Sequence, residues 1–177
     1  MVKFTIPYAY DKNLGFAYNS DVVSADSEWV GLCDRDTIFH HSDFGHKVSA
    51  VVKEHGDGVY TSLTGRTNCS WQRLVVNITN DIEYHRQVAE HQWEKWGTHV
   101  EEHTNSQLMS GHLIVVKKEL WTPIEKTGIL GIDNLVHQYA KDKGIPVYLM
   151  KGVYQYHYYS NFDGVGGHQK RDKSHLK

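Results

Sequence analysis

Two spacings of apolar residues alternate along this chain, and together they predict strands separated by helices. Short, nearly continuous apolar runs are typical of buried strands, and we expect them over residues 3–8, 28–33, 58–63, 113–116, 145–150 and 153–158. Apolar positions three and four residues apart are typical of amphipathic helices, which we expect over residues 14–24, 43–56, 80–97 and 133–143. Strands interleaved with helices predict an α/β domain whose central sheet is mostly parallel and flanked by helices.

Polar residues and glycines mark the ends of these helices. Ser42 or Asp43 can cap the second helix. Asn80, with Glu83 three residues later, resembles a capping box for the third helix. A glycine is expected to end each of the last three helices: Gly56, Gly97 and Gly144. One side of the third helix carries apolar residues that we expect in the core: Ile82, Ala89, Trp93 and Trp96.

Composition and charge narrow the class of protein. The 177 residues suffice for one domain, which we expect over residues 1–160, followed by a flexible basic tail over residues 161–177. The net charge of −2 argues against a general nucleic-acid-binding protein. Cys33 and Cys69 are expected to be reduced core residues, although a disulfide between them stays open. No apolar run is long enough to span a bilayer and no signal pattern stands at the N-terminus, so we expect a cytoplasmic protein.

An acidic pair stands directly after the second predicted strand, where Asp34 and Asp36 flank Arg35. The carboxyl ends of strands in α/β sheets are where ligands bind, and Mg²⁺ and Mn²⁺ prefer oxygen ligands such as carboxylates. Two acids in a structural surface turn are an equally good interpretation of this spacing alone. Arg35 is expected to be a solvent-facing charge.

Four segments, in this order, give the chain a family resemblance. They are Phe4-Thr5-Ile6-Pro7-Tyr8, then Trp29-Val30-Gly31-Leu32-Cys33-Asp34-Arg35-Asp36, then Met109-Ser110-Gly111-His112-Leu113, and Gly131-Ile132-Asp133-Asn134 leading to the run from Met150 to Tyr159. In combination they resemble glycosyltransferases of the GT-A fold, close to family 2, over most of the chain. The resemblance implies a GT-A-type fold with a shortened N-terminal half, because the family usually has a longer segment and one more strand before the acidic pair.

The resemblance implies a metal centre made of Asp34, Asp36 and His157. In the family the acidic pair holds Mn²⁺ or Mg²⁺ against the diphosphate of a nucleotide-sugar. Asp36 would bind the metal directly, and Asp34 would bind the metal or the ribose of the donor. A late histidine completes the metal shell in many of these enzymes, and a neutral imidazole is a good ligand for Mn²⁺. The alternative for His157 is an ordinary core or strand-edge histidine.

The resemblance also implies an acceptor side and a donor-sugar pocket. Asp133 matches the general base that removes a proton from the acceptor hydroxyl in inverting members, although Ile132 stands where the family commonly has Glu. A helix N-cap is the alternative for Asp133, and the two roles are compatible. The turn that contains Ser110, Gly111 and His112 would line the donor-sugar pocket, with Gly111 allowing close approach of the backbone.

The nucleotide would lie against the end of the first strand and the C-terminal tail. Pro7 and Tyr8 match the segment that meets the base, and Tyr8 or Tyr10 could stack on it. The glycines before Lys170 and Arg171 suggest a lid that closes over the diphosphate, and a frayed end is the alternative.

Together these residues predict a metal-dependent glycosyltransferase that moves a sugar from a nucleoside-diphosphate sugar to an unidentified acceptor hydroxyl. A UDP-sugar is the expected donor. One alternative is a non-catalytic relative that binds sugar nucleotides or glycans. The other is a metal-dependent phosphoesterase or nuclease, which would usually carry more clustered acids and histidines for two metals.

Overall fold

The structure is a computed structural model, and it describes residues 1–77, 79–125, 128 and 130–158. The strands are β1 (Val2–Thr5), β2 (Trp29–Cys33), β3 (Thr37–Phe39), β4 (Val59–Thr64), β5 (Val100–Glu102), β6 (Leu113–Lys117) and β7 (Val147–His157). The helices are α1 (Leu14–Ser24), α2 (Phe44–His55), α3 (Ile82–Trp96) and α4 (Ile132–Asp142), with two 3₁₀ turns at Ser70–Gln72 and Lys118–Leu120. The α/β class predicted from the sequence is therefore confirmed.

The seven strands form one open, mixed sheet, which corrects the expectation of a mostly parallel one. Its order is β1-β2-β6-β4-β7-β3, and β5 also pairs with β7. The β1–β2 and β4–β7 pairs are parallel, whereas β6 is antiparallel to both of its neighbours and β3 and β5 are antiparallel to β7. The apolar run of β6 has no polar alternation because both of its faces are buried, so nothing in the run indicates the strand's direction.

The strands differ from the prediction at four places, the first being β1, which was predicted over residues 3–8 and ends at Thr5. The short strands β3 and β5 were not predicted, because three residues are too few for a periodic pattern. The two strands predicted near the C-terminus are one strand, β7, with an irregularity between Met150 and Tyr154 in its pairing with β4. At this point the chain passes tightly against another turn, because a Cβ on Gly152 would overlap the carbonyl oxygen of Gly97.

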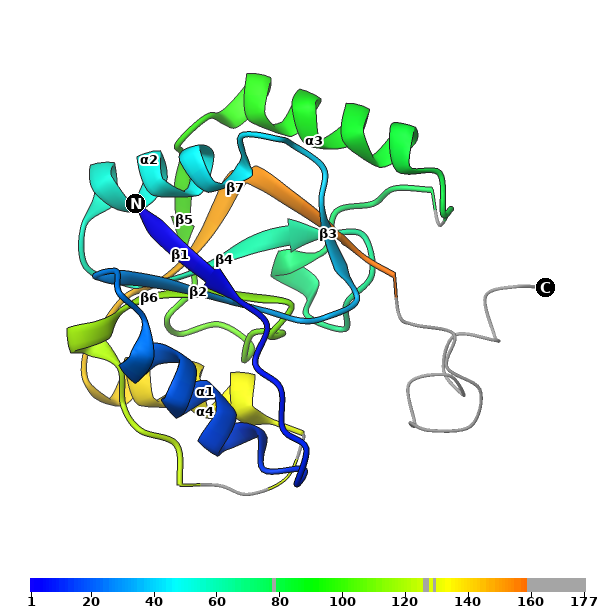
Figure 1. The fold of residues 1–177 in the computed structure, drawn as a ribbon. Coiled ribbons are helices and arrows are strands. Elements are labelled where there is room, and N and C mark those ends of the chain that lie inside the picture. The colour runs from blue at the N-terminus through cyan, green and yellow to red at the C-terminus, as the bar shows by residue number, and fades with distance from the viewer. Residues whose placement is uncertain (78, 126–127, 129, 159–177) are drawn as a thin grey trace.

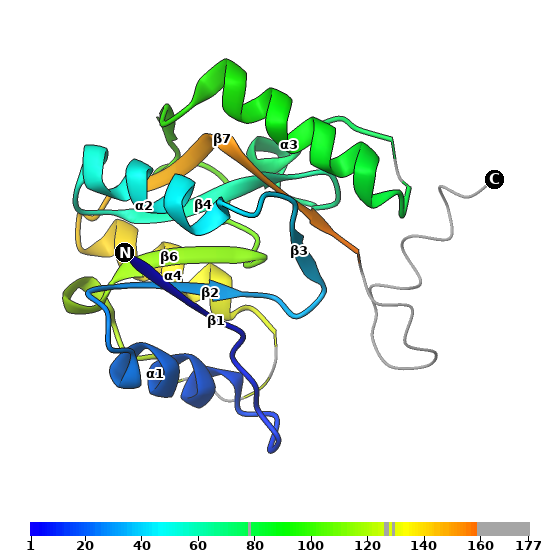
Figure 2. The same cartoon turned by 45° about the horizontal axis from the view of Figure 1, so that its top comes forward.

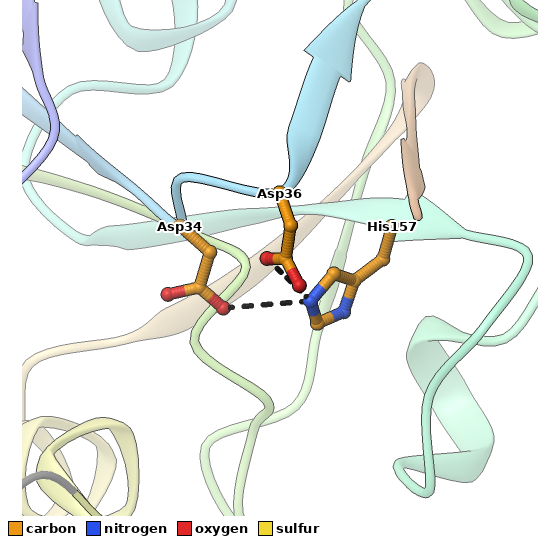
Figure 3. A group of neighbouring side chains, drawn as sticks. All are labelled: Asp34, Asp36 and His157. Atoms are coloured by element: carbon orange, nitrogen blue, oxygen red, sulfur yellow. Dashed lines mark hydrogen bonds and ion pairs between the residues drawn. The ribbon is translucent and has the colours of Figure 1, made fainter. Parts of the chain in front are cut away.

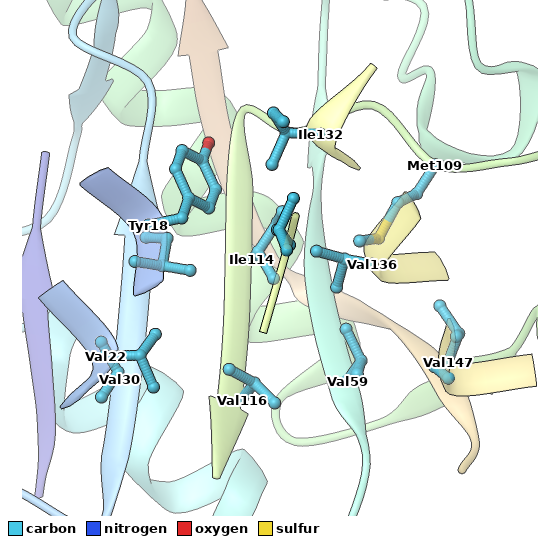
Figure 4. Close-up of a cluster of buried hydrophobic side chains, with 13 residues drawn as sticks. Tyr18, Val22, Val30, Val59, Met109, Ile114, Val116, Ile132, Val136 and Val147 are labelled. Atoms are coloured by element: carbon cyan, nitrogen blue, oxygen red, sulfur yellow. The ribbon is translucent and has the colours of Figure 1, made fainter. Parts of the chain in front are cut away.

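Helices cover both faces of the sheet. Figures 1 and 2 show α1 and α4 together on one face and α2 with α3 on the other. The core under α1 and α4 joins Tyr18 and Val136 to strand residues such as Val30 and Ile114, all at most 5% exposed (Figure 4). The opposite core is formed by side chains of α2 with those of five strands, among them Val48, Val51, Tyr60, Val115 and Met150. The two cores hold the sheet, and therefore the ends of its strands, in a fixed arrangement.

The helix ends agree closely with those predicted from the sequence, except that a different residue caps α3. Asp81, not Asn80, caps this helix, because its carboxylate accepts hydrogen bonds from the backbone N–H groups of Glu83 and Tyr84. Glu83 pairs with Arg86 instead of closing a capping box. Glycines end α2 and α3, as predicted, and Gly144 follows α4 with a φ of 68°.

The predicted inward side of α3 is only partly correct. Ala89 is fully buried and Trp93 packs partly buried against the core under α2, but Ile82 is 58% exposed. Trp96 is half-buried between His99 and the Lys151 ammonium group. Ile82 is the first residue of α3 and is exposed despite its helical spacing from Ala89, so helical spacing alone overestimates its burial.

Two further sequence expectations concern the whole chain. Cys33 and Cys69 are both buried free thiols, as expected. Among the described residues, none of the helices combines the length and the apolar composition that crossing a bilayer requires.

Candidate metal centre

The side chains of Asp34, Asp36 and His157 meet at one edge of the sheet. Asp34 follows β2, Asp36 precedes β3, and His157 is the last residue of β7. One ligand atom from each lies within 4.8 Å of the other two. The Nε2 atom of His157 is 2.9 Å from Oδ1 of Asp36 and 3.9 Å from Oδ2 of Asp34 (Figure 3). Three residues that the sequence singled out thus form one cluster.

Strand directions explain why this edge collects the cluster. The pairings make β1, β2, β4 and β7 run in one direction, so their carboxyl ends share an edge. Because β6 runs the opposite way, its amino end, with His112 just before it, lies at the same edge. The backbone N–H of Asp34 donates to the carbonyl oxygen of His112 over 3.2 Å, which ties the end of β2 to the start of β6.

The acidic pair lies in a tight turn between β2 and β3. The carbonyl oxygen of Asp34 accepts hydrogen bonds from the backbone N–H of Thr37, at 3.3 Å, and from its hydroxyl, at 2.7 Å. After the turn, Thr37 pairs with His157, and the N–H of Tyr158 donates to the carbonyl oxygen of Asp36 over 2.8 Å. The two acids therefore do lie in a structured turn, and the same turn, through β3, brings Asp36 against His157.

The charge balance of the cluster favours a cation. Burial raises the pKa of Asp34 to about 7; His157 opposes the rise, and the carboxylates of Asp36 and Asp133 add to it. Its side chain keeps 38% of its surface exposed, against 21% for Asp36 and 10% for His157. The charges of Asp36 and Asp133 both disfavour the ionised form of Asp34, and a divalent cation relieves such repulsion.

The distances suit the coordination of a small divalent cation. At an octahedral metal with bonds of about 2.1 Å, neighbouring ligands lie about 3.0 Å apart and opposite ligands about 4.2 Å apart. The His157–Asp36 distance of 2.9 Å, which is that of a hydrogen bond, also matches neighbouring ligands, whereas the His157–Asp34 distance of 3.9 Å matches neither value, so a bound ion requires a small shift of one side chain. One imidazole and two carboxylates form a donor set suited to Mn²⁺ or Mg²⁺. The residues present therefore fit such an ion.

Asp133 lies beside the cluster, in the first turn of α4. The helix begins one residue earlier than predicted, after Gly131 in a left-handed conformation with a φ of 75°, so Asp133 is not the N-cap. Its Oδ1 accepts the N–H of Asn134 over 2.9 Å. A Cβ on Gly111 would lie 2.8 Å from the Cβ of Asp133, so a side chain at position 111 would collide with it. The predicted close approach at Gly111 is thus a contact with Asp133.

The other two residues of this turn face inward. Ser110 is half-buried, and its backbone N–H and carbonyl both bond to the side chain of Gln72, at 2.6 and 3.0 Å. The ring of His112 is fully buried, 6.5 Å from the ring of His157. Burial therefore keeps the ring of His112 from a ligand at the surface.

The predicted nucleotide residues follow β1, at the edge where the acidic pair lies. Tyr8 and Tyr10 are 75% and 91% exposed, and Pro7 is half-buried. The aromatic faces of both tyrosines are accessible to a planar ligand. Lys170 and Arg171, with the rest of the predicted lid, lie outside the described residues.

One residue near the site was missed. Tyr18 of α1 is 4% exposed and packs on the apolar core (Figure 4), and its pKa is raised well above the usual value by burial and by the charges of Asp34 and Asp133. Its hydroxyl therefore stays protonated and can donate a hydrogen bond near the acids. In the sequence Tyr18 has the spacing of a core residue, so no signal separates it from an ordinary buried tyrosine.

The comparisons with known proteins add no family to this description. No family model matches the chain, and no curated protein matches it.

Proposed function

We propose that the chain is a metal-dependent glycosyltransferase of the GT-A type, which moves a sugar from a nucleoside-diphosphate sugar, with UDP as the expected carrier, to an acceptor hydroxyl. The observation that carries the proposal is the meeting of Asp34, Asp36 and His157 at the carboxyl edge of an α/β sheet. This edge is where such sheets bind ligands. The ordered sequence segments that resemble the family include all three residues.

In this proposal Asp34, Asp36 and His157 hold Mn²⁺ or Mg²⁺. A divalent cation bound there supplies positive charge against the diphosphate, whose leaving group gains negative charge as the glycosidic bond breaks. Tyr8 or Tyr10 stacks on the base, because both rings are exposed beside the same edge. The Tyr18 hydroxyl is a candidate donor to the bound sugar.

The acceptor oxygen bonds to the anomeric carbon as the bond from that carbon to the phosphate oxygen breaks. Asp133 takes the proton of the acceptor hydroxyl if the reaction inverts the anomeric centre. Support for this role is its place beside Asp34, since the charge of Asp133 contributes to the raised pKa of Asp34. Because Gly111 has no side chain, Asp133 can lie close to the turn that the resemblance assigns to the donor sugar.

The test is a titration of the purified protein with UDP-sugars and GDP-sugars, with and without Mn²⁺, followed by an assay of donor hydrolysis and transfer. Asp36→Ala is expected to lose metal-dependent donor binding while it stays folded. Asp43→Ala, which removes an exposed aspartate at the start of α2, is the matched control and is expected to bind normally.

Each other outcome has its own meaning. Tight donor binding without turnover would favour the non-catalytic relative. The segment between β1 and β2, which is shorter than is usual in the family, also favours this alternative. Release of phosphate from esters, or cleavage of nucleic acid, would favour the phosphoesterase or nuclease. Binding of donors by Asp36→Ala as by the parent protein would contradict the proposed metal centre.

A further inference from the structure

We infer that His112 is a positioning residue, which holds the ends of β2 and β7 at the separation that lets Asp34 and His157 share one cation. The inference deepens the proposed function, because it rests on the same metal centre. His112 is placed for this task because it immediately precedes β6, the strand that lies between β2 and β4. Its side chain is fully buried.

The hydrogen bonds of the ring determine its tautomer. Nε2 of His112 lies 3.1 Å from the backbone carbonyl oxygen of Ser62, which can only accept, so Nε2 carries the proton. The same atom lies 3.0 Å from the hydroxyl oxygen of Ser62, and that hydroxyl donates onward to Oε1 of Gln155 over 3.2 Å. His112, Ser62 and Gln155 therefore form one buried chain of hydrogen bonds from the start of β6 through β4 to β7.

This chain reaches both of the segments that carry the metal ligands. The carbonyl oxygen of His112 accepts the N–H of Asp34 over 3.2 Å, so the first ligand is attached to the backbone of His112. Gln155 lies two residues before His157 on β7, and residues two apart point to the same face of a strand. The ring of His112 also lies against the ring of His157, with centroids 6.5 Å apart and planes inclined by 30°. His112 is thus linked to Asp34 by a backbone hydrogen bond and to β7 through Ser62.

Stability alone does not explain a polar chain at this place. Every member is fully buried, yet Nδ1 of His112 and Nε2 of Gln155 find no hydrogen-bond partner within the described part of the chain. A partly satisfied buried network is less stable than well-packed apolar side chains of the same volume. A function in orienting the ligands accounts for this cost, as it does for the outer residues of other metal sites.

Another buried histidine provides the matched control. His137 of α4 is also fully buried, but both of its ring nitrogens are bonded, Nδ1 to the N–H of Met109 at 3.0 Å and Nε2 to the carbonyl oxygen of Thr104 at 3.1 Å. Among the described residues, no bond of His137 reaches Asp34, Asp36 or the end of β7 that carries His157; its partner Thr104 bonds to Val147, at the opposite end of that strand. Its replacement should therefore disturb the fold without disturbing the metal ligands.

The experiment titrates the full-length protein with Mn²⁺ alone, by calorimetry and by electron paramagnetic resonance, and records the melting temperature of each variant. His112→Phe is expected to fold and to bind Mn²⁺ at least tenfold more weakly than the parent. His112→Gln is expected to recover most of this loss, because its amide nitrogen can donate to Ser62 where Nε2 does. His137→Phe is expected to lower the melting temperature while its Mn²⁺ affinity stays within twofold of the parent.

Parental Mn²⁺ affinity in folded His112→Phe would overturn the inference, as would an equal loss in His137→Phe or no recovery in His112→Gln. If His112→Phe does not fold, Ser62→Ala replaces it, with an expected loss of Mn²⁺ affinity of about tenfold and the same criterion. Because no sugar nucleotide is present, the result is separate from transfer activity. Mn²⁺ binding without any transfer would refute the proposed function and leave the role of His112 standing, whereas a parent protein that binds no Mn²⁺ would refute both.

Discussion

The two faces of the end of β7 carry similar residue types in opposite chemical settings. On one face Tyr154 and Tyr156 pack against His85 of α3, whose ring lies 3.6 Å from that of Tyr156. On the other face His157 meets the carboxylates of Asp34 and Asp36. A histidine among phenols and a backbone carbonyl is a neutral packing element, whereas a histidine beside carboxylates is part of a charged cluster. The partners of an imidazole, more than its burial, indicate whether it belongs to a site.

The largest effect should come from the packing face. Tyr156→Ala removes a fully buried ring that stacks on His85, so we expect it to lower the free energy of unfolding by about 3–5 kcal/mol. Urea unfolding followed by circular dichroism measures the change. A loss below about 1 kcal/mol would show that the aromatic face does not hold β7 in place.

His157, next to Tyr156, should affect metal binding strongly and stability only slightly. His157→Ala removes one ligand of the proposed metal centre, and we expect Mn²⁺ affinity to fall by about a hundredfold or more while stability changes by about 1 kcal/mol. Calorimetric titration with Mn²⁺, in parallel with the same urea experiment, checks both quantities. Retention of Mn²⁺ affinity by this variant would remove the distinction between the two faces.

A third variant tests whether the histidines on the face of β7 that carries Tyr154 and Tyr156 are neutral. His40 belongs to this group, because its ring lies near those of His85 and Tyr154. His40 is 6% exposed, and burial together with the nearby histidines His85 and His41 lowers its pKa from 6.5 to about 4. The folded state binds this proton less tightly than the unfolded state, so the contribution to stability is complete above pH 6.5 and is lost as the pH falls towards 4.

His40→Phe removes this proton-binding site and two buried ring nitrogens that find no partner among the described residues. We expect the free energy of unfolding of the variant, relative to that of the parent, to rise by about 1–3 kcal/mol as the pH falls from 7 to 4.5. Thermal unfolding across this range measures the gain, and the histidines that do not interact with His40 cancel in the difference. A constant difference at all pH values would contradict the assigned neutrality of His40.

The smallest effect belongs to the charged face. Because the pKa of Asp34 is raised to about 7, its folded state holds the proton more tightly than the unfolded state, and stability is lost as the pH rises from about 4 through 7. Asp34→Asn should therefore be more stable than the metal-free parent at pH 8. We expect about 1 kcal/mol, because exposure of the side chain screens the repulsion, and no difference at pH 3.

Melting curves at pH 8 and pH 3 measure the difference in stability between Asp34→Asn and the parent. Mn²⁺ should raise the melting temperature of the parent but not that of Asp34→Asn. The same pKa means that Mn²⁺ affinity of the parent rises with pH up to about 7, since the carboxyl group must lose its proton to bind the ion. A variant less stable than the parent at pH 8 would show that the acids of the cluster do not repel each other.

The sequence predicted which residues form the charged cluster. It did not predict the strand pairing and the burial that surround them. Asp34 and Asp36 were singled out from residue type and the end of a strand, and His157 from the family resemblance, and the three side chains do meet. The pairing of β3 with β7, which places Asp36 against His157, was not foreseen, because residues 37–39 have no strand pattern of their own. The burial of His112 was not foreseen either, since a histidine in a turn before a strand has the same local sequence whether it faces a ligand or the core. Tyr18 was missed because its spacing in the sequence is that of an ordinary core residue, although it lies near the acids.

The antiparallel β6 has a consequence for how the chain acquires its site. This strand is inserted between β2 and β4, and β7 joins the sheet only afterwards in chain order. Asp36 and His157 are 121 residues apart, so the last member of the proposed metal centre arrives only when the final strand docks. Contacts between such distant segments form late and slow the folding of a domain. Uptake of a cation would therefore mark the completed fold, and a chain interrupted before β7 would have no centre to fill.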